Sequence, residues 1–341
     1  MGITLRVNGN EFTGFEQVTV TASIDEVARS FSFSTFQDLS SDIVGQDECT
    51  VFIEGQKVLT GYIERIDTSV TGGRTSLTFS GRSKTADFID CSPSVKGFNF
   101  SKRNIAEIAD RIAEPFGIDV ISNAPSATIA YSAVNQGETC FEYLERLCRQ
   151  DGLLLTTNAN GDLVITQAST DKYEGSLNIN DDTCGIVSSS SSFDWSNRFS
   201  SYEVKAQSDD KTSSSTAKDT SIRRHRPTII IAEGNVSSPA NRARNHALRL
   251  SGEAITAEFT VKGFLTNKGE LLEPNKLIYV NNPYLRMDQS MLVKSVMYEV
   301  TAQGFGATVT LIDPRAYYAA RPRIINSFED LKDLPSAEQI N

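Results

Sequence analysis

The chain has 341 residues, of which 39% are hydrophobic and 22% charged, and its formal net charge is −10. This length predicts two to three domains, and the absence of any run of 18 apolar residues argues against a membrane span. The first hundred residues carry 8 Lys and Arg against 13 Asp and Glu. That balance argues against a surface that binds nucleic-acid phosphates, although it also fits charges that only keep the monomer soluble.

The amino terminus and the cysteines point to a protein folded in a cytoplasm. No apolar segment followed by a small-residue cleavage site opens the chain, so we expect no secretory signal. The cysteines are odd in number, widely spaced and without a Cys-x-x-Cys pair: Cys49, Cys91, Cys140, Cys148 and Cys184. We expect free, buried thiols here, and neither a disulfide framework nor a zinc site.

Residues 1–81 have the alternating pattern of short strands. Apolar and polar residues alternate at 3–7, 18–22 and 31–36, and similar segments follow as far as Phe79. Turn-forming triplets that contain glycine separate them, as at Asn8-Gly9-Asn10. Six or seven short strands with tight turns predict a small antiparallel barrel or sandwich.

The periodicity becomes helical near residue 100. Ser101 is a candidate cap for a helix that ends at Pro115, and a second helix is expected over 138–151. Two strands joined by an Asn-Gly turn follow, at 153–157 and 163–166. Together these segments predict a compact α/β unit.

The remaining chain is read as strands, one helix and two serine-rich stretches. The stretches at 188–192 and 208–221 are of low complexity, and we expect the second to be a mobile loop. A helix is expected at 238–251, with Ser238 as cap and Gly252 just past its end. Strands are expected at 199–206, 227–232, 255–261, 277–280, 291–300 and 307–312, followed by a poorly ordered tail.

A count of strands favours discontinuous domains. Residues 171–232 offer about four strands, too few to close a barrel, and the hairpin at 291–312 would complete one. The helix at 238–251 and its strands would then rejoin the earlier α/β unit. We therefore expect nested domains.

We find no catalytic, cofactor-binding or metal-binding constellation. His225 and His246 have no Cys or second His at metal-ligand spacing, and no nucleophile elbow or phosphate loop is present. The carboxylate pairs at 181–182 and 209–210 lie in polar loops, where solvated charge is the simpler interpretation.

One local charge anomaly remains, formed by Arg223, Arg224 and Arg226. In an acidic protein these three arginines fit a salt bridge between subunits, a solvated loop end or a contact with phosphates. We take a subunit interface as the working interpretation.

Several motifs in a fixed order resemble the Mu-type phage tail baseplate hub family, the prophage tail proteins related to late-control D proteins. Residues 60–66 read TGYIERI and residues 80–92 read SGRSKTADFIDCS, similar to the end of the family's first barrel. Residues 137–147, GETCFEYLERL, are similar to a family helix that precedes two strands. Residues 224–227 with 232–234 also resemble a family segment, and the likeness extends from about residue 3 to 318.

The resemblance implies a mixed, mainly β fold with two tube-type antiparallel β-barrels plus an α/β domain, in discontinuous domains. We expect the first barrel at 1–95 and the α/β domain at 96–170 and 233–285. We expect the second barrel at 171–232 and 286–316, and a C-terminal tail at 317–341.

The resemblance further implies a structural, non-enzymatic hub subunit without cofactors, assembled in the host cytoplasm into the virion tail. A homotrimeric ring would join the sixfold tail tube protein to the threefold central spike protein, touch other baseplate proteins and let DNA pass without specific binding. We expect the acidic excess of the first barrel on the channel side. The alternatives are a tailocin or secretion-type hub, a carbohydrate-binding tail adhesin, and a hydrolase that uses acidic residues.

Overall fold

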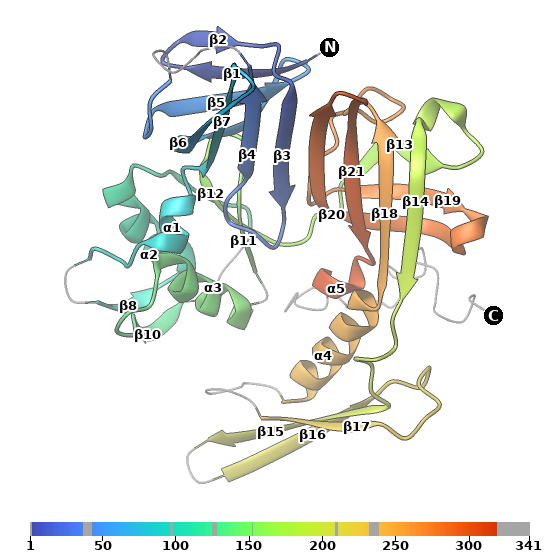
Figure 1. The fold of residues 1–341 in the computed structure, drawn as a ribbon. Helices are drawn as coiled ribbons and strands as arrows, with labels where there is room; N and C mark the ends of the chain where they lie inside the picture. Colours follow the sequence, from blue (N-terminus) through green and yellow to red (C-terminus); the bar gives the residue numbers. More distant parts are fainter. Residues whose placement is uncertain are drawn as a thin grey trace.

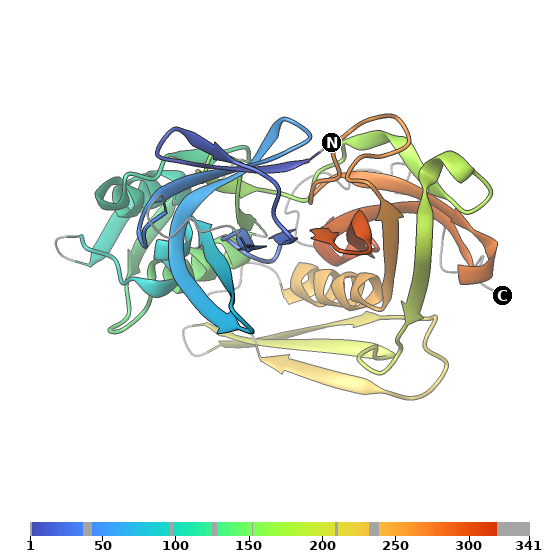
Figure 2. The ribbon, with the colours of Figure 1, turned by 45° about the horizontal axis from the view of Figure 1, so that its top comes forward.

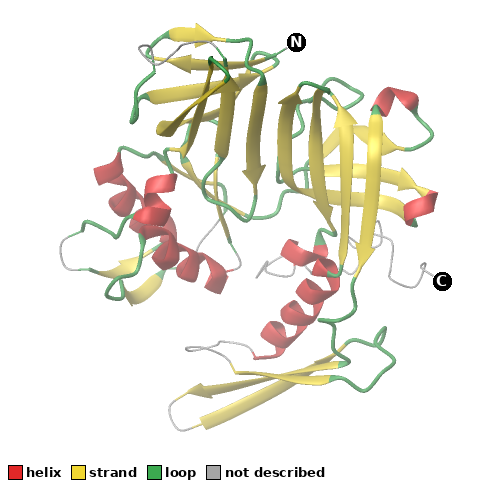
Figure 3. Cartoon of the chain, in the orientation of Figure 1, coloured by secondary structure: helices red, strands yellow, loops and turns green. Residues whose placement is uncertain are grey.

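The computed structural model describes residues 2–36, 43–95, 98–124, 128–151, 153–208, 211–231 and 239–318. Two β regions lie side by side, an α/β unit adjoins the first, and a small sheet with a helix adjoins the second (Figure 1). The longer helices lie at the same end of the two β regions (Figure 3). Within the described residues, no helix has both the length and the apolar character needed to cross a membrane.

The first β region is an antiparallel sheet that curves around its own core. Its strands follow the order β3-β4-β7-β6-β5-β1-β2. Their bounds are β1 (Ile3–Val7), β2 (Asn10–Phe12), β3 (Gln17–Ser23), β4 (Ser30–Thr35), β5 (Glu48–Ile53), β6 (Gln56–Thr71) and β7 (Arg74–Ser83). Every second residue of β3 and β4 is buried, which is the two-residue period that the sequence predicts for a half-buried strand.

The second β region has its strands in the order β14-β18-β21-β20-β19-β13. The bounds are β13 (Lys172–Asn178), β14 (Ile186–Phe193), β18 (Ile255–Lys262), β19 (Leu277–Asn282), β20 (Met287–Thr301) and β21 (Gly304–Ile312), with two single turns, η2 (Asp182–Cys184) and η3 (Pro283–Leu285). All neighbouring strands are antiparallel except β13 and β19, which are parallel.

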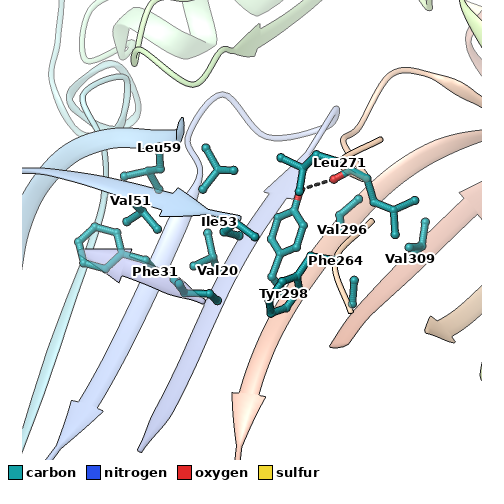
Figure 4. Packing of buried hydrophobic residues seen from close by; sticks show 14 of the residues in the cluster. Val20, Phe31, Val51, Ile53, Leu59, Phe264, Leu271, Val296, Tyr298 and Val309 are labelled. Carbon is teal, nitrogen blue, oxygen red and sulfur yellow. Dashed lines mark hydrogen bonds between the residues drawn. The ribbon is translucent and has the colours of Figure 1, made fainter. Parts of the chain in front are cut away.

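An antiparallel pairing of β3 with β20 joins the two regions into one continuous sheet. Val18 lies opposite Val300, and Val20 lies opposite Tyr298. Tyr298 is fully buried and packs edge to face against Phe264, with ring centroids 6.0 Å apart. Its hydroxyl donates a hydrogen bond to the carbonyl oxygen of Leu272 (Figure 4). One hydrophobic cluster therefore runs through both regions.

The α/β unit has a separate core. Its elements are α1 (Ala86–Asp90), β8 (Asn99–Arg103), α2 (Ile105–Ala113), η1 (Glu114–Phe116), β9 (Val120–Ser122), β10 (Ile129–Ala133), α3 (Cys140–Asp151), β11 (Leu154–Thr157) and β12 (Leu163–Thr166). The apolar faces of α2 and α3 meet in a cluster of their own. Ser101, the expected cap of α2, lies in β8; Asn104 is the cap, because its side chain accepts from the N–H of Glu107 at 2.9 Å.

A third part is made of β15 (Ser201–Ser208), β16 (Lys211–Lys218) and β17 (Pro227–Ile231), with α4 (Pro239–Glu253) packed on β15 and β16 and against α5 (Arg315–Tyr318). Gly252, expected just past the helix, lies inside α4. A Cβ atom there would come within 2.1 Å of the backbone nitrogen of Ala316, so the glycine permits the close approach of α5.

The expected fold class, mainly β with several discontinuous parts, is confirmed, but the structure divides the second half differently from the expected bounds. Residues 233–285 were expected to join the α/β unit. Instead β18 and β19 pair with β21 and β20, and α4 contacts the small sheet. Conversely, β15–β17, expected in the second barrel, form their own sheet. Pairing between distant strands decides this arrangement, and local patterns do not encode it. Most of the expected tail lies outside the described residues.

Both serine-rich stretches are mainly strand where they are described, and only residues 219–221 lie in a turn. Residues 188–192 lie in β14, and most of 208–221 lies in the hairpin of β15 and β16. None of the five cysteines, all of which the structure describes, forms a disulfide, and four of them are buried.

Candidate functional site

The two β regions repeat the same strand order. Reading from β3, the first region runs β3-β4-β7-β6-β5-β1, and the second runs β14-β18-β21-β20-β19-β13 in matching chain order. Thus β6 corresponds to β20, and β3 corresponds to β14. One difference is that β1 is antiparallel to β5, whereas β13 is parallel to β19.

The repeat extends to single residues. The pairing of β6 with β7 shifts at Glu64, and the pairing of β20 with β21 shifts at Lys294. These two bulges lie at the same distance from the hairpins, which close at Thr71 and Thr301. A bulge of this kind bends a strand and increases its twist, so both long strands bend at the same place.

Cross-strand hydroxyl pairs repeat as well. The hydroxyls of Ser34 and Thr78 lie 2.9 Å apart between β4 and β7. At the matching positions of β18 and β21, the hydroxyls of Thr260 and Thr308 lie 3.3 Å apart. The sequences of the two regions show no obvious repeat, yet their geometry is duplicated.

One face of the continuous sheet is covered by hydroxyl side chains, and we call it the hydroxyl face. Opposite residues of an antiparallel pair point to the same side, and the pairing registers of these strands connect the positions from strand to strand. Its members are partly or fully exposed, and outside β14 most of them alternate with buried apolar residues: Ser188, Ser190, Ser192, Thr256, Thr260, Thr308, Thr310, Ser295, Thr19, Thr21, Ser30, Ser32, Ser34, Ser76, Thr78 and Ser80.

Charged residues on the hydroxyl face are scattered and of both signs. Acidic Glu258 and Glu299 lie among the hydroxyls, and basic Lys262, Arg74 and Arg82 lie at the ends of β18 and β7. The Arg82 guanidinium is neutralised by Glu64 at 2.8 Å and Asp90 at 2.6 Å, and these hydrogen bonds raise its pKa above the ordinary value. The acidic excess that we expected on a channel side is therefore not gathered on this face.

Several strands of the described residues have a free edge, and two of these edges lie where the internal β3–β20 junction would be repeated. β14 pairs only with β18, and the outer half of β6, residues 64–71, pairs only with β7. In Figure 2 the light-blue hairpin of β6 and β7 projects from the first region, and the yellow-green β14 lies at the far side of the second. The matching outer half of β20 is covered by β3. Unpaired edges of this length are sites for pairing with another chain.

The three arginines of the sequence prediction lie just before β17 and serve different purposes. Arg226 contacts its own chain: its guanidinium donates to the carbonyl of Ser196 at 2.6 Å and lies 5.3 Å from the centroid of the Phe199 ring. Arg223 and Arg224 are exposed. The structure thus brings Arg226 into internal packing and leaves the other two side chains directed to solvent.

The remaining candidates have local explanations. His246 packs edge to face on Tyr202, 5.8 Å between centroids, and burial lowers its pKa, helped by Arg249 and Arg242. Asp181 accepts hydrogen bonds from Thr183 in a turn, and residues 209–210 lie outside the described part of the chain. Across the described residues, no group of three or more His, Cys, Asp and Glu could hold a metal ion.

Sequence reasoning missed the hydroxyl face and the free edges. The signal was present in the alternation of serine with phenylalanine in β4 and of threonine with valine and leucine in β21. The five serines of β14 were taken as low complexity because they lack such apolar neighbours.

Models of three family domains match the chain. They are the baseplate hub protein gp44-like second domain at residues 85–167, the Mu phage baseplate assembly protein GpP-like N-terminal domain at 2–83, and the GpP fourth domain at 238–320. The baseplate hub protein gp44 of Escherichia phage Mu is 32% identical over 337 residues, which cover 92% of this chain and 88% of that protein.

Solved structures agree with this likeness. The 43 kDa tail protein of prophage MuSo2 from Shewanella oneidensis superposes with a TM-score of 0.84 at 30% identity, covering 92% of this chain and 99% of that one. A tail protein from Neisseria meningitidis MC58 has the same fold, with a TM-score of 0.81 at 22% identity, covering 93% and 98% of the two chains.

Proposed function

This chain belongs to the Mu-type baseplate hub family and is a structural protein of the phage tail baseplate, and we propose that three copies of it close into a ring at the centre of the baseplate. In this proposal the ring joins a sixfold tail tube to a threefold spike. One end of the ring meets the tube protein, and the other meets the spike and further baseplate proteins. The ring assembles in the host cytoplasm.

The duplicated geometry of the two β regions carries this proposal. A threefold ring of chains that each contain two equivalent β regions presents six equivalent docking surfaces to a sixfold partner. The shared strand order and the two bulges at Glu64 and Lys294 support this equivalence. A chain with a single β region would offer only three such surfaces.

The hydroxyl face fits the lining of a DNA channel. Lys and Arg along a channel would bind duplex DNA through release of its counterions, and that binding would slow its passage. Serine and threonine are uncharged, and their side chains are short. A wall covered mainly by them offers duplex DNA few fixed positive charges, and Arg82 on this face is already neutralised by Glu64 and Asp90.

The structural role requires no catalytic group, and we propose that the chain is not an enzyme. We also propose that Arg223 and Arg224 face a partner subunit, because their side chains are exposed on an otherwise acidic protein. Arg226 then supports this loop from within through its contacts with Ser196 and Phe199.

The mass of the full chain in solution tests the ring. We expect light scattering to give three times the mass of one chain at micromolar concentration. A stable monomer over a wide concentration range, or an assembly without a threefold axis, would contradict the proposal. We also expect no retarded DNA band at low-nanomolar protein, and a retarded band would contradict the neutral channel.

A further inference from the structure

We propose that the outer half of β6 in one subunit pairs antiparallel with β14 of the next copy, in the register of the internal β3–β20 junction. This inference deepens the ring proposed above and rests on it. It names the partner of both free edges, a second copy of this chain, and it assigns the residues that meet.

The internal junction provides the template. β20 is divided by its bulge: residues 287–292 pair with β19, and residues 295–300 pair with β3. β6 is divided in the same way, since residues 56–62 pair with β5 and residues beyond the bulge pair only with β7. The place that β3 fills beside β20 is therefore open beside β6.

The strand that corresponds to β3 in the second region is β14. Thr19 pairs with Ser32 of β4, and the matching position on β14 is Ser190, which pairs with Glu258 of β18. β14 therefore has the position and direction of β3 within its own region. When the second region of one copy follows the first region of another, β14 arrives where β3 lies in the internal junction.

The register follows from these equivalences. The internal pairs are Val18 with Val300, Thr19 with Glu299, Ala22 with Val296 and Ser23 with Ser295. Transferred to the free edges, they place the following residues of two copies opposite each other: Ser189 and Val70, Ser190 and Ser69, Phe193 and Ile66, Asp194 and Arg65.

The side chains at these positions suit one another. Ile66 and Phe193 are partly buried against the core of their own regions, so their pairing would continue the apolar layer. Val70 is 70% exposed in the single chain. Arg65 and Asp194 carry opposite charges, and opposite charges directly across an antiparallel pair attract.

The hydrogen-bond pattern identifies the best position for a test. In the template the N–H of Ile24 donates to the carbonyl of Lys294 at 2.9 Å, so alternate pairs from this point are hydrogen-bonded. Thr19 and Glu299 then form a non-hydrogen-bonded pair, and so would Ser69 and Ser190. The Cα atoms of such a pair lie about 4.5 Å apart, within the range of a disulfide.

The experiment compares two double variants of the full chain, Ser69→Cys with Ser190→Cys and Ser69→Cys with Ser192→Cys. All four changes replace an exposed serine by a residue of similar size. The control differs only by a shift of two residues on the same face, which separates the Cα atoms by about 7–8 Å. β6 and β14 of one chain are seven strand spacings apart, about 33 Å along the sheet, and Figure 2 shows them well apart, so a bond within one chain is out of reach.

After mild oxidation we expect the S69C/S190C variant to give covalent dimers and trimers on denaturing gels, with the wild-type chain as blank. The S69C/S192C variant should cross-link at least tenfold less. Light scattering of the unoxidised proteins is measured in parallel. A trimer without this cross-link, or one in which Cys at 69 bonds preferentially to Cys at 192, would overturn the register. The proposed ring would still hold in that case. A monomer without any cross-link would overturn both.

Discussion

The outer halves of β6 and β20 have the same geometry but different surroundings. The half of β20 is covered by β3 within the chain and includes the fully buried Tyr298. At the position of Tyr298, β6 has the exposed Thr68. A junction made inside one chain forms during folding and can therefore contain large apolar groups. The edge that stays open until assembly has fewer large apolar groups, Val70 being the exposed exception, which lowers the risk of wrong pairing.

Substitution of Tyr298 and of its counterpart Thr68 should give the largest difference in the free energy of unfolding. Replacing Tyr298 by Ala should lower the free energy of unfolding by about 3–5 kcal/mol, because a large aromatic side chain leaves a cavity in the shared core. Replacing Thr68 by Ala should change it by no more than about 0.5 kcal/mol, since the side chain is at the surface.

Urea denaturation of dilute protein measures both variants. An equal loss of unfolding free energy in the two variants would show that the internal junction is packed no better than the open edge.

Charge reversal at the open edge should have a smaller effect, on assembly alone. Arg65→Asp places two acidic groups opposite each other at each junction between copies, and we expect the trimer to dissociate at roughly two- to tenfold higher concentration. The double variant Arg65→Asp with Asp194→Arg should restore the trimer. Trp195, the sole tryptophan of the chain and 52% exposed beside β14, reports dissociation through its fluorescence on dilution.

Arg65 contacts Asp67 within its own strand at 2.7 Å, so Asp67→Asn is the matched control that keeps the basic group. If the double variant does not regain the trimer while the Asp67→Asn control stays trimeric, the assigned register is wrong.

The smallest expected effect lies outside both junctions, at His246 of α4. Burial lowers the pKa of this imidazole below its ordinary value of 6.5, so the unfolded chain binds the proton more tightly than the folded one. The stabilisation from neutral His246 is thus complete above pH 6.5 and is lost as pH falls toward the folded pKa.

We expect the melting temperature to fall slightly between pH 7.5 and pH 5.5, and the fall to be smaller in the His246→Gln variant. The trimer mass should not change over this range in either protein. A change in mass with pH would show instead that a titrating group lies at a junction between copies.

Local sequence patterns predicted most of the helices and strands, but they could not predict which distant strands pair. The alternation at 31–36 identified β4, and the helical period identified α2 and α3. The strand at 255–261 was also expected, but its assignment to the α/β unit was wrong, because its partner β21 lies some fifty residues away.

The candidate site was less visible from sequence than the fold. Arg223 and Arg224 stood out because like charges cluster there, and their role as an interface stays a prediction. The hydroxyl face draws its members from seven strands of both regions, and serine and threonine attract little notice one at a time. Only the registers show that they share one side of the sheet.

The paired bulges at Glu64 and Lys294 have a consequence for the kinds of genetic change that the chain tolerates. Beyond each bulge, one residue added or removed would turn every following side chain to the opposite side of the sheet. Hydroxyl side chains would then enter the core, and valine and tyrosine would lie on the hydroxyl face. Exchanges among small polar residues at 67–71 should therefore be freely accepted during evolution, whereas single-codon insertions or deletions between a bulge and its hairpin should be rejected.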